Sequence, residues 1–329
     1  MALRSALAQT EPSIEVIVVD DCSNDDTVRV AREFAASDAR VRVITRQTNG
    51  GPAAARNTAL AQARGAWFTV LDSDDLYDAD RIARLVAIGE AGHADMVADN
   101  FVSFAVDDLR TARPFLPPDE TGRWVDSIAY LNATRLYAGC ANLGYLKPMI
   151  RTNVLNNNGI LYNEAIRIGE DDDLVLRLLL AGARYWYEPM LTYGYRVSNT
   201  SISHRFSATN AAASAVAAAD IASASCSAAL NRALRARHRA IVRARDFALL
   251  VNSIKSRRPV STLRLIVANP MIVPLLREAI EVRLRAFRPL QPTLTDDTAH
   301  AALLRMVVAA GAACADLSTG AVRPLEVGN

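Results

Sequence analysis

The sequence predicts an α/β protein in which helices flank a mostly parallel sheet, followed by a region made only of helices. Short β-branched runs alternate with amphipathic segments up to about residue 205, which is the order of strands joined by crossover helices. Beyond that point Ala, Arg and Leu dominate, and the spacing of apolar residues is helical. We therefore expect a first domain over residues 1–204 and a helical C-terminal region over residues 205–329.

The first strands and helices follow from local signals. A β-branched run at residues 15–19 predicts a buried strand, and the polar cluster after it offers caps for a helix at residues 27–37. Residues 41–44 predict a second strand. The next helix has Pro52 in its first turn and Gly65 just beyond its end, which is the usual asymmetry of these two residue types.

The following elements repeat the alternation. Residues 66–71 predict a third strand, residues 78–90 a helix and residues 96–104 a further strand. Parallel sheets bind ligands beyond the carboxyl ends of their strands. Acidic residues stand at two of these ends, directly after residues 19 and 71. The sequence therefore predicts a ligand site at this edge of the sheet.

The acidic residues after the third predicted strand, Asp72 to Asp75, allow two interpretations. Alternate carboxylates such as Asp72 and Asp74 can converge on one hard cation, and Mg²⁺ and Mn²⁺ take oxygen ligands. A cation there stabilises a diphosphate leaving group. The other interpretation is a solvated turn that caps the following helix, because acidic residues favour helix starts.

Similar alternatives apply to Asp20 and Asp21 and to the Gly-rich segment 49–57. The two carboxylates either accept hydrogen bonds from a nucleobase or cap the helix that follows. The Gly-rich segment runs into a helix, so its backbone N–H groups can face an anion, and Arg56 can add a charge-assisted bond to phosphate. An ordinary turn accounts for the same glycines.

Four adjacent acids, Glu170 to Asp173, open another predicted helix. Capping is their simplest role, because the helix dipole favours negative charge at its N-terminus. Crowding of like charges, in contrast, raises at least one pKa, and a carboxylate with a raised pKa is a better general base at neutral pH. The dipole and the crowding act in opposite directions, so both roles stay open.

The composition excludes several classes of protein. Apolar residues make up 51%, charged residues 22%, and the formal net charge is +2, so the chain is globular and has no charge that calls for nucleic acid. The four cysteines are scattered without metal or disulfide spacing, which favours a reducing compartment. No apolar run approaches the roughly 20 residues of a spanning helix, and the start lacks a secretory signal. We expect a cytoplasmic protein.

Four stretches in a fixed order carry a family resemblance: EVIVVDDCSNDDT, NGGPAAARNTAL, ARGAWFTVLDSDD and LKPMIRTNVLNNNGILYNEAIRIGED. Over about residues 1–204 the chain resembles the family-two glycosyltransferases, which have a GT-A fold and invert the anomeric configuration. The last stretch is similar to bacterial members that assemble exopolysaccharides. The resemblance implies a nucleotide-sugar donor, most often a UDP-sugar, a glycan acceptor, and Mg²⁺ or Mn²⁺ as the cofactor.

The resemblance also implies roles for single residues in the donor site. Asp21, with Asp20 as the alternate, contacts the nucleobase, and Arg56 lies near the nucleotide. Asp72 contacts the ribose beside the metal, and Asp74 ligates the metal that bridges the diphosphate.

Further implied roles fall later in the chain. Asp171, directly after Glu170, is the general base that takes the proton of an acceptor hydroxyl. Arg196 and the segment 201–203 match a stretch that closes over the diphosphate in relatives. Many relatives carry a histidine two residues after that arginine, where this chain has Ser198, which leaves the metal without a third protein ligand at this position.

The chain departs from the family at its start. Relatives begin with a strand and a nucleotide-holding loop, whereas this chain opens on what resembles the end of the next helix. We expect that roughly 20–30 residues, the size of a strand–helix unit, are absent through a misplaced start or a truncated gene. In the family the absent strand lies between residues 15–19 and 66–71, so two interior sheet edges would lack partners.

The helical region and the whole chain each keep alternatives. Arginines cluster between residues 232 and 258, and residues 263–285 are amphipathic. This pattern fits peripheral contact with the inner face of the plasma membrane, suited to a lipid-linked acceptor, or a helical cap with solvated arginines. For the whole chain the rivals of the transferase are a non-catalytic truncated remnant that acts as an interaction protein, and a nucleotidyltransferase, which usually opens on a Gly-rich loop.

Overall fold

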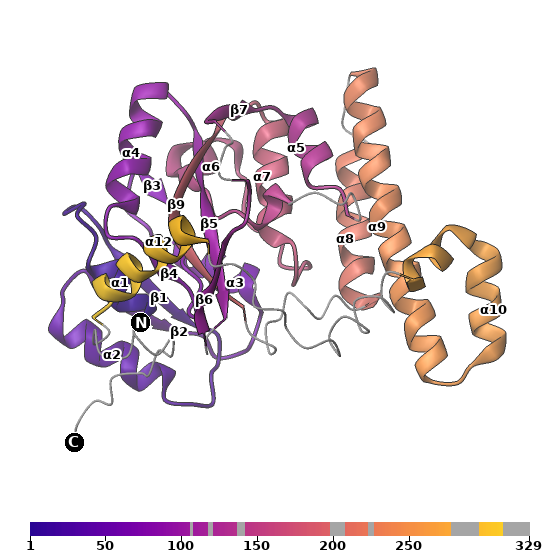
Figure 1. Cartoon of the computed structure of the whole chain (residues 1–329), viewed down its shortest axis with the longest axis horizontal. Helices are drawn as coiled ribbons and strands as arrows, with labels where there is room; N and C mark the ends of the chain where they lie inside the picture. The colour runs from indigo at the N-terminus through magenta and orange to yellow at the C-terminus, as the bar shows by residue number, and fades with distance from the viewer. Residues whose placement is uncertain are drawn as a thin grey trace. The chain divides into compact units, whose positions relative to one another are not determined.

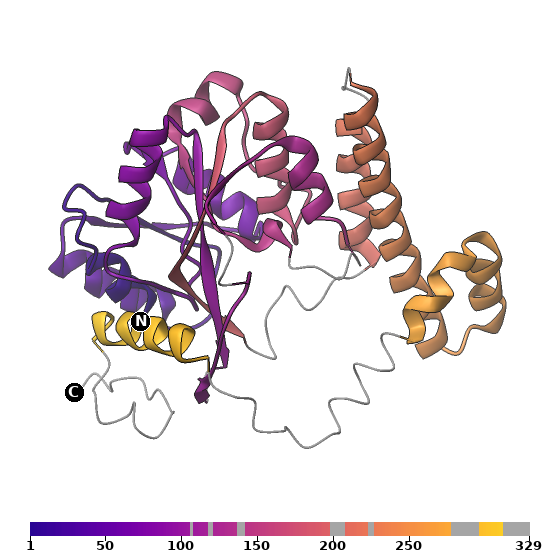
Figure 2. The same cartoon turned by 45° about the horizontal axis from the view of Figure 1, so that its top comes forward.

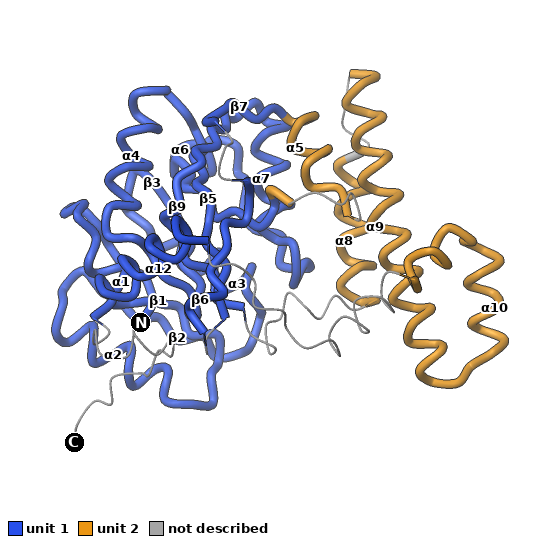
Figure 3. Tube along the Cα trace, in the orientation of Figure 1, with its two compact units in different colours: residues 1–126, 144–199, 295–329 blue, residues 127–143, 200–294 orange. Residues whose placement is uncertain are grey.

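The computed structural model describes residues 1–105, 108–117, 121–136, 142–197, 208–222, 227–277 and 296–311. The chain forms two compact units (Figure 3). Unit 1 comprises residues 1–126, 144–199 and 295–329, and unit 2 comprises residues 127–143 and 200–294. The units therefore divide the chain differently from the single boundary expected after residue 204.

The first part of unit 1 is a βαβ arrangement. Strand β1 (Val16–Asp20) pairs in parallel with β2 (Val41–Thr45), and α2 (Thr27–Ser37) connects them. Helix α1 (Ala2–Leu7) precedes them, and α3 (Pro52–Leu60) follows. The β-branched runs pair along their full length, because each side chain fits a pleated, half-buried surface. Among the described residues β1 pairs with β2 alone.

A seven-stranded sheet forms the rest of the core of unit 1, in the order β3-β8-β5-β9-β4, with β6 on β5 and β7 on β9. The strands are β3 (Trp67–Phe68), β4 (Leu76–Tyr77), β5 (Met96–Ala105), β6 (Asp108–Pro114), β7 (Arg123–Val125), β8 (Met149–Arg151) and β9 (Tyr185–Val197). The long β5–β9 pair is parallel, whereas the other described pairs of this sheet are antiparallel. The predicted α/β class is confirmed, with a sheet that is mixed rather than mostly parallel.

The antiparallel β5–β6 pair arises from a short connection between its strands, whereas the predicted alternation of strands and helices gives parallel pairs. Strand β6 follows β5 after a short connection, and antiparallel neighbours need only a short turn, whereas a parallel pair needs a crossover. Within the predicted strand at residues 66–71, only Trp67 and Phe68 pair in a ladder, and their partner is β8 (Met149–Arg151). The chain beyond β3 therefore leaves the sheet as a loop.

Helices cover the sheet of unit 1 (Figures 1 and 2): α4 (Arg81–Gly92), α6 (Thr152–Asn158), α7 (Glu170–Leu180) and α12 (Asp297–Ala309). Helix α12 lies against β6 and β9. Its apolar face, with Leu303, Met306 and Val307, is completely buried against Val102 and Leu109. This burial assigns the last described helix to the sheet domain and not to the helical region.

Unit 2 is helical. It contains α5 (Ser127–Ala133), α8 (Ala208–Ala222), α9 (Ala228–Lys255), α10 (Pro259–Ala268) and the 3₁₀ turn η3 (Pro270–Ile272), and η1 (Leu143–Tyr145) lies at its border. Helices α8 and α9 pack along each other (Figure 1) through small apolar residues such as Ala215, Ala218 and Ile241. The predicted helical appendage is confirmed for the described residues. No single described helix has the length and hydropathy to cross a membrane. The bent pair 259–268 and 270–277 meets these two criteria only when its helices are taken together.

Candidate functional site

The two aspartates at the end of β1 bind backbone N–H groups of nearby loops and do not cap the following helix. The buried carboxylate of Asp20 accepts the Ser23 backbone N–H at 3.3 Å. The Asp21 carboxylate accepts the N–H groups of Gly50 at 2.9 Å and Gly51 at 2.6 Å. Gly51 is the N-cap of α3, so the anion at this helix start is the carboxylate of Asp21 itself. Neither carboxylate caps α2.

Arg56 brings together three carboxylates from distant stretches of the chain. Its Nη2 donates to Asp72 Oδ1 at 2.9 Å. Its Nη1 donates to Asp171 Oδ1 at 2.7 Å and also to Glu170 Oε1. Arg56 lies on α3, Asp72 follows β3, and the two other acids open α7. The site therefore joins residues that are far apart in the sequence, because Arg56 and Asp171 are separated by 115 positions.

Lys147 completes the cluster from the segment before β8. Its Nζ lies 2.7 Å from Asp171 Oδ2 and 2.9 Å from Asp72 Oδ2. Asp72 and Asp171 thus each bind Arg56 with one oxygen and Lys147 with the other. The Lys147 and Arg56 side chains are only 10% and 11% exposed, so water weakens these ion pairs little.

The charges in the cluster stabilise one another. Burial opposes ionisation of Asp72, but the ammonium of Lys147 and the guanidinium of Arg56 outweigh it and lower the pKa of Asp72. Burial also opposes the charge of Lys147, yet Asp171 and Asp72 raise the pKa of this lysine well above its ordinary value. Glu170 behaves differently, because burial, and next the neighbouring Asp171, raise its pKa. At neutral pH the cluster therefore contains two cations, Arg56 and Lys147, and at least one ionised carboxylate, that of Asp72.

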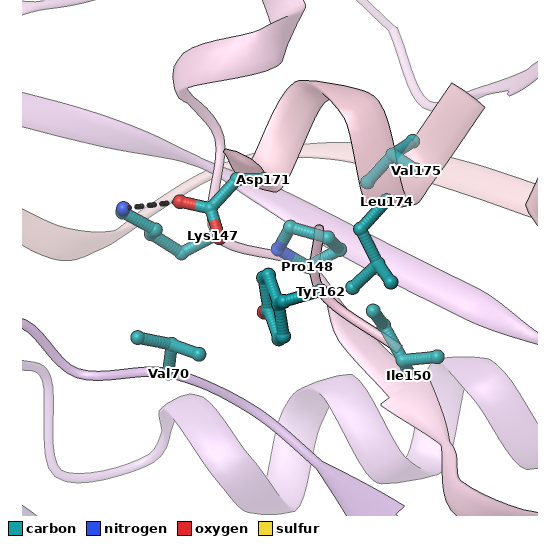
Figure 4. A pocket seen from close by; sticks show the side chains of 8 residues that line it. All are labelled: Val70, Lys147, Pro148, Ile150, Tyr162, Asp171, Leu174 and Val175. Atoms are coloured by element: carbon teal, nitrogen blue, oxygen red, sulfur yellow. Dashed lines mark hydrogen bonds and ion pairs between the residues drawn. The ribbon is translucent and has the colours of Figure 1, made fainter. Parts of the chain in front are cut away.

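A small pocket opens beside this cluster (Figure 4). The Asp171 carboxylate and the Lys147 ammonium lie at one side, and apolar side chains form the rest of the wall. Tyr162 is a further wall residue, and its ring lies under the Arg56 guanidinium with 5.5 Å between Cζ and the ring centroid. The lining residues are Val70, Lys147, Pro148, Ile150, Tyr162, Asp171, Leu174 and Val175. A carboxylate in the wall of a largely apolar pocket suits proton abstraction from a bound hydroxyl.

A fully buried ion pair holds the backbone of Lys147. Arg81 Nη2 lies 2.7 Å from Asp99 Oδ1, and the two side chains are 0% and 1% exposed. The same Arg81 Nη2 donates to the Lys147 carbonyl at 2.7 Å. The guanidinium also stacks over the Tyr77 ring at 4.3 Å. Arg81 therefore links α4 and β5 to the loop that presents the cluster lysine.

Helix α7 is set at the cluster by the glycine before it. Gly169 is its N-cap and has a φ of 87°, a left-handed conformation that glycine adopts without steric cost. The turn presents Glu170 and Asp171 in the first helical turn, where the dipole favours negative charge. The acids at this helix start thus combine dipole stabilisation with contacts to Arg56.

The acidic loop after β3 does not cap α4. Strand β4 separates the two, and Asp80 is the N-cap of α4. The capping interpretation of the loop is therefore wrong for Asp75, which is buried and accepts the Tyr193 hydroxyl at 2.6 Å and the Arg196 backbone N–H at 2.9 Å. Burial, and next the charge of Asp72, raise the pKa of Asp75 to about 7.

Asp74 is the carboxylate of this loop that no described side chain binds. It is half-buried and makes no hydrogen bond or ion pair with the described part of the chain. Asp72, in contrast, is shared between Arg56 and Lys147. No group of three described acid, histidine or cysteine side chains converges as a preformed metal site. This donor set fits a Mg²⁺ or Mn²⁺ ion held by one or two carboxylates together with phosphate oxygens.

The segment around Arg196 is described only in part. The Arg196 backbone binds Asp75, and its buried Nε has no hydrogen-bond partner among the described residues. Ser198 and the segment 201–203 lie outside the described residues.

Lys147, Tyr162 and Arg81 are site residues that sequence reasoning missed. Lys147 carried a signal, because it is one of only two lysines among 37 basic residues in a chain that otherwise uses arginine. Arg81 carried none, since it stands at the start of an ordinary amphipathic helix.

Comparison with known proteins identifies the family. The sequence model described as Glycosyl transferase family 2 matches residues 1–142. Succinoglycan biosynthesis protein ExoO of Rhizobium meliloti is 34% identical over 287 residues, which cover 86% of this chain and 81% of ExoO. Succinoglycan biosynthesis protein ExoU of the same species is 36% identical over 208 residues, or 61% of this chain and 59% of ExoU.

Solved structures agree with the fold. S. aureus TarS 1–349, in complex with UDP-GlcNAc, superposes with a TM-score of 0.59 at 19% identity and covers 82% of this chain and 87% of that one. The mannosyltransferase PcManGT from Pyrobaculum calidifontis, in complex with GDP-Man and Mn²⁺, gives a TM-score of 0.52 at 20% identity and covers 93% and 81%. The predicted GT-A fold is confirmed. With a relative as similar as ExoO across most of its length, and with carboxylates that meet at the edge of a GT-A sheet, the chain belongs to glycosyltransferase family 2 and is a glycosyltransferase.

Proposed function

We propose that this glycosyltransferase moves one sugar from a nucleoside-diphosphate sugar to a hydroxyl of a growing bacterial surface polysaccharide, with inversion at the anomeric carbon. The observation that carries the proposal is the meeting of Asp171 with Arg56 and Lys147 beside a pocket. A carboxylate and two cations in one place are what deprotonation of an acceptor and binding of a diphosphate require. The succinoglycan relatives support a polysaccharide product.

In this proposal Asp171 is the general base. Its carboxylate takes the proton of the acceptor hydroxyl while that oxygen attacks the anomeric carbon, and the bond from this carbon to the diphosphate oxygen breaks. Direct displacement inverts the configuration. In the described state both oxygens of Asp171 are ion-paired. Arrival of the donor diphosphate therefore has to draw Arg56 and Lys147 toward phosphate, which frees the base. Glu170 stays beside Arg56 and steadies α7.

Donor recognition is proposed for the aspartates at the strand ends. Asp21 or Asp20 meets the nucleobase, with uracil favoured, and Asp72 meets the ribose. Arg196 is proposed to reach the diphosphate, which would provide an acceptor for its unpaired buried Nε. Asp21 must first release the N–H groups of Gly50 and Gly51, so nucleotide binding includes a local rearrangement of this loop.

A divalent cation is proposed at Asp74, with Asp72 beside it, and either Mg²⁺ or Mn²⁺ suits these oxygen donors. When bound, the cation supplies charge neutralisation to the diphosphate leaving group. Asp74 contributes a carboxylate that no described side chain occupies.

The acceptor and the place of action are proposed as well. A lipid-linked glycan at the cytoplasmic face of the plasma membrane would agree with a basic helical region and with polysaccharide assembly. We propose peripheral contact with this membrane through the basic helical region.

A donor screen with the purified chain tests the proposal. Release of nucleoside diphosphate from UDP- and GDP-sugars is measured with Mn²⁺ and with chelator, followed by Asp171→Asn. We expect this change to lower kcat by at least about a hundredfold while UDP binding is retained, because the cations proposed to bind the diphosphate stay in place. Asp172→Asn, which removes the same charge one residue along α7, is the control and should retain most activity.

Each rival has its own result. Absence of both nucleotide binding and turnover for every donor would favour the non-catalytic remnant. Dependence on a nucleoside triphosphate would favour the nucleotidyltransferase. Full activity of the Asp171→Asn variant would refute the assignment of the base but not the transferase itself.

A further inference from the structure

Helix α10 presents a stripe of apolar side chains to solvent. Val260, Leu263 and Val267 are 64%, 64% and 73% exposed. They are spaced at i, i+3 and i+7, so they lie on one face of the helix. No residue of α10 is buried. An ordinary surface helix turns such a stripe toward the core, and this one does not.

The stripe continues on a defined surface. After the bend at Asn269, Met271 is 57% exposed and Val273 is 40% exposed, while Ile272 between them is fully buried and η3 contacts α9. The Asn269 side chain donates to Asp246 on α9 at 3.0 Å. The segment is therefore docked on α9 through its inner side, and the outward apolar residues belong to a folded surface (Figure 3, unit 2).

Basic residues flank the stripe in the sequence. From residue 247 to residue 277 the sequence contains five basic residues and no acidic residue. Lys255, Arg257, Arg258 and Arg264 are exposed and form no ion pair with the described part of the chain. Exposed apolar side chains bordered by unpaired cations are the pattern that binds anionic lipid head groups and the acyl boundary beneath them.

We propose that α10 and the turn after it dock in the interface of an anionic phospholipid bilayer. The helix lies in the plane of the surface, with Val260, Leu263 and Val267 in the acyl boundary and the basic residues at the head groups. A second copy of the chain is a poorer occupant, because a two-fold contact through this face would bring the same cations together. This inference names the surface for the membrane contact proposed above and rests on that proposal, while its test does not use the transfer reaction.

Vesicle flotation of the full chain tests the inference. The probes are vesicles of phosphatidylcholine alone and vesicles that also contain phosphatidylglycerol. We expect binding to the anionic vesicles and little to the neutral ones, with affinity that falls as salt is raised. Leu263→Ser with Val267→Ser should weaken binding to anionic vesicles at least about tenfold. Arg257→Gln with Arg258→Gln should weaken it severalfold and reduce the effect of salt.

Matched controls decide between outcomes. Val216→Ser on α8 removes an apolar side chain that is also 64% exposed, and it should bind vesicles as the parent chain does. Equal binding of the parent chain to neutral and anionic vesicles, or unchanged binding by both pairs of substitutions, would overturn the inference. So would a dimer in light scattering that dissociates with Leu263→Ser and Val267→Ser. Asp171→Asn should bind vesicles normally, so loss of transfer and loss of docking are separable.

Discussion

Replacement of Lys147 by methionine tests the charge balance on which the site depends. Methionine keeps an unbranched side chain of similar length but removes the ammonium that lies 2.7 Å from Asp171 and 2.9 Å from Asp72. Arg56 still binds both carboxylates. The variant therefore leaves two partly compensated carboxylates in a poorly hydrated place.

The magnitude follows from burial. Removal of one partner of a buried ion pair costs about 3–5 kcal/mol of unfolding free energy. Asp72 is 30% exposed, so water recovers part of this loss, and the remaining Arg56 contacts recover more. We expect a loss of about 2–3 kcal/mol. Addition of Asp72→Asn removes one incompletely compensated charge. The double variant should therefore lose about 1–2 kcal/mol less stability than the sum of the two single losses.

Urea unfolding followed by tryptophan fluorescence is the assay, because all three tryptophans of the chain lie in unit 1. Lys255→Met, the same substitution at the exposed lysine of unit 2, is the control and should change stability by less than about 0.5 kcal/mol. Strict additivity of Lys147→Met and Asp72→Asn would show that the two side chains are not coupled and would refute the reasoning. Under the proposed function, Lys147→Met also weakens binding of the donor diphosphate.

Three further outcomes are expected. The pKa of Asp75 is raised from 3.8 to about 7, so between these values the folded state binds a proton that the unfolded state has lost. The free energy of unfolding should therefore fall as pH rises from about 4 to 7, by at most about 1.4 kcal/mol per pH unit. Asp75→Asn should flatten the profile of melting temperature against pH. Arg81→Met should cost about 3–5 kcal/mol in urea unfolding, and Arg81→Met with Asp99→Leu should cost less than Arg81→Met alone. Gly89→Ala should destabilise by about 1–3 kcal/mol and shift the emission of Trp67, although Gly→Ala usually stabilises a helix, because the new Cβ would lie 2.6 Å from the Trp67 ring.

Much of the fold was predictable because its signals are local. The strand and helix at residues 15–37 form almost at the predicted bounds, as β1 and α2. Hydrophobic periodicity and caps act within a few residues and leave a clear mark in the sequence. Strand β7, in contrast, has only three residues and forms because it pairs with β9, which lies far away in the sequence. Its stability comes from a partner that no local window contains.

The position of α12 was unpredictable for a related reason. Its apolar face resembles that of any amphipathic helix, and periodicity does not say which surface it covers. Its burial against β6 depends on Leu109, almost 200 residues earlier. The same limit applies to Arg81, whose hydrogen bond to the Lys147 carbonyl exists only once α4 packs on β5.

Prediction from sequence is limited even more strongly for the contacts between site residues. Sequence reasoning found Asp72, Glu170 and Asp171 because acids at strand ends and helix starts are visible in a linear pattern. Which cation each acid meets is a property of tertiary structure. Lys147 binds the oxygen of Asp72 and the oxygen of Asp171 that Arg56 does not bind. This shared contact exists only when the loop after β3 and α7 lie side by side.

The charges of the site argue for a divalent cation in the working enzyme. Arg56 and Lys147 supply two positive charges against the three acids Asp72, Glu170 and Asp171, and the raised pKa of Glu170 relieves only part of the excess. A diphosphate brings two further negative charges into a place where water screens little. If the two cations turn from the carboxylates to phosphate, Asp72 and Asp171 lose their partners, and this cost is large for buried groups. Further positive charge at Asp74 would balance the diphosphate while Asp171 acts as the base. The arrangement of ion pairs in the free chain thus supports the proposed cation by an argument that does not rely on the family.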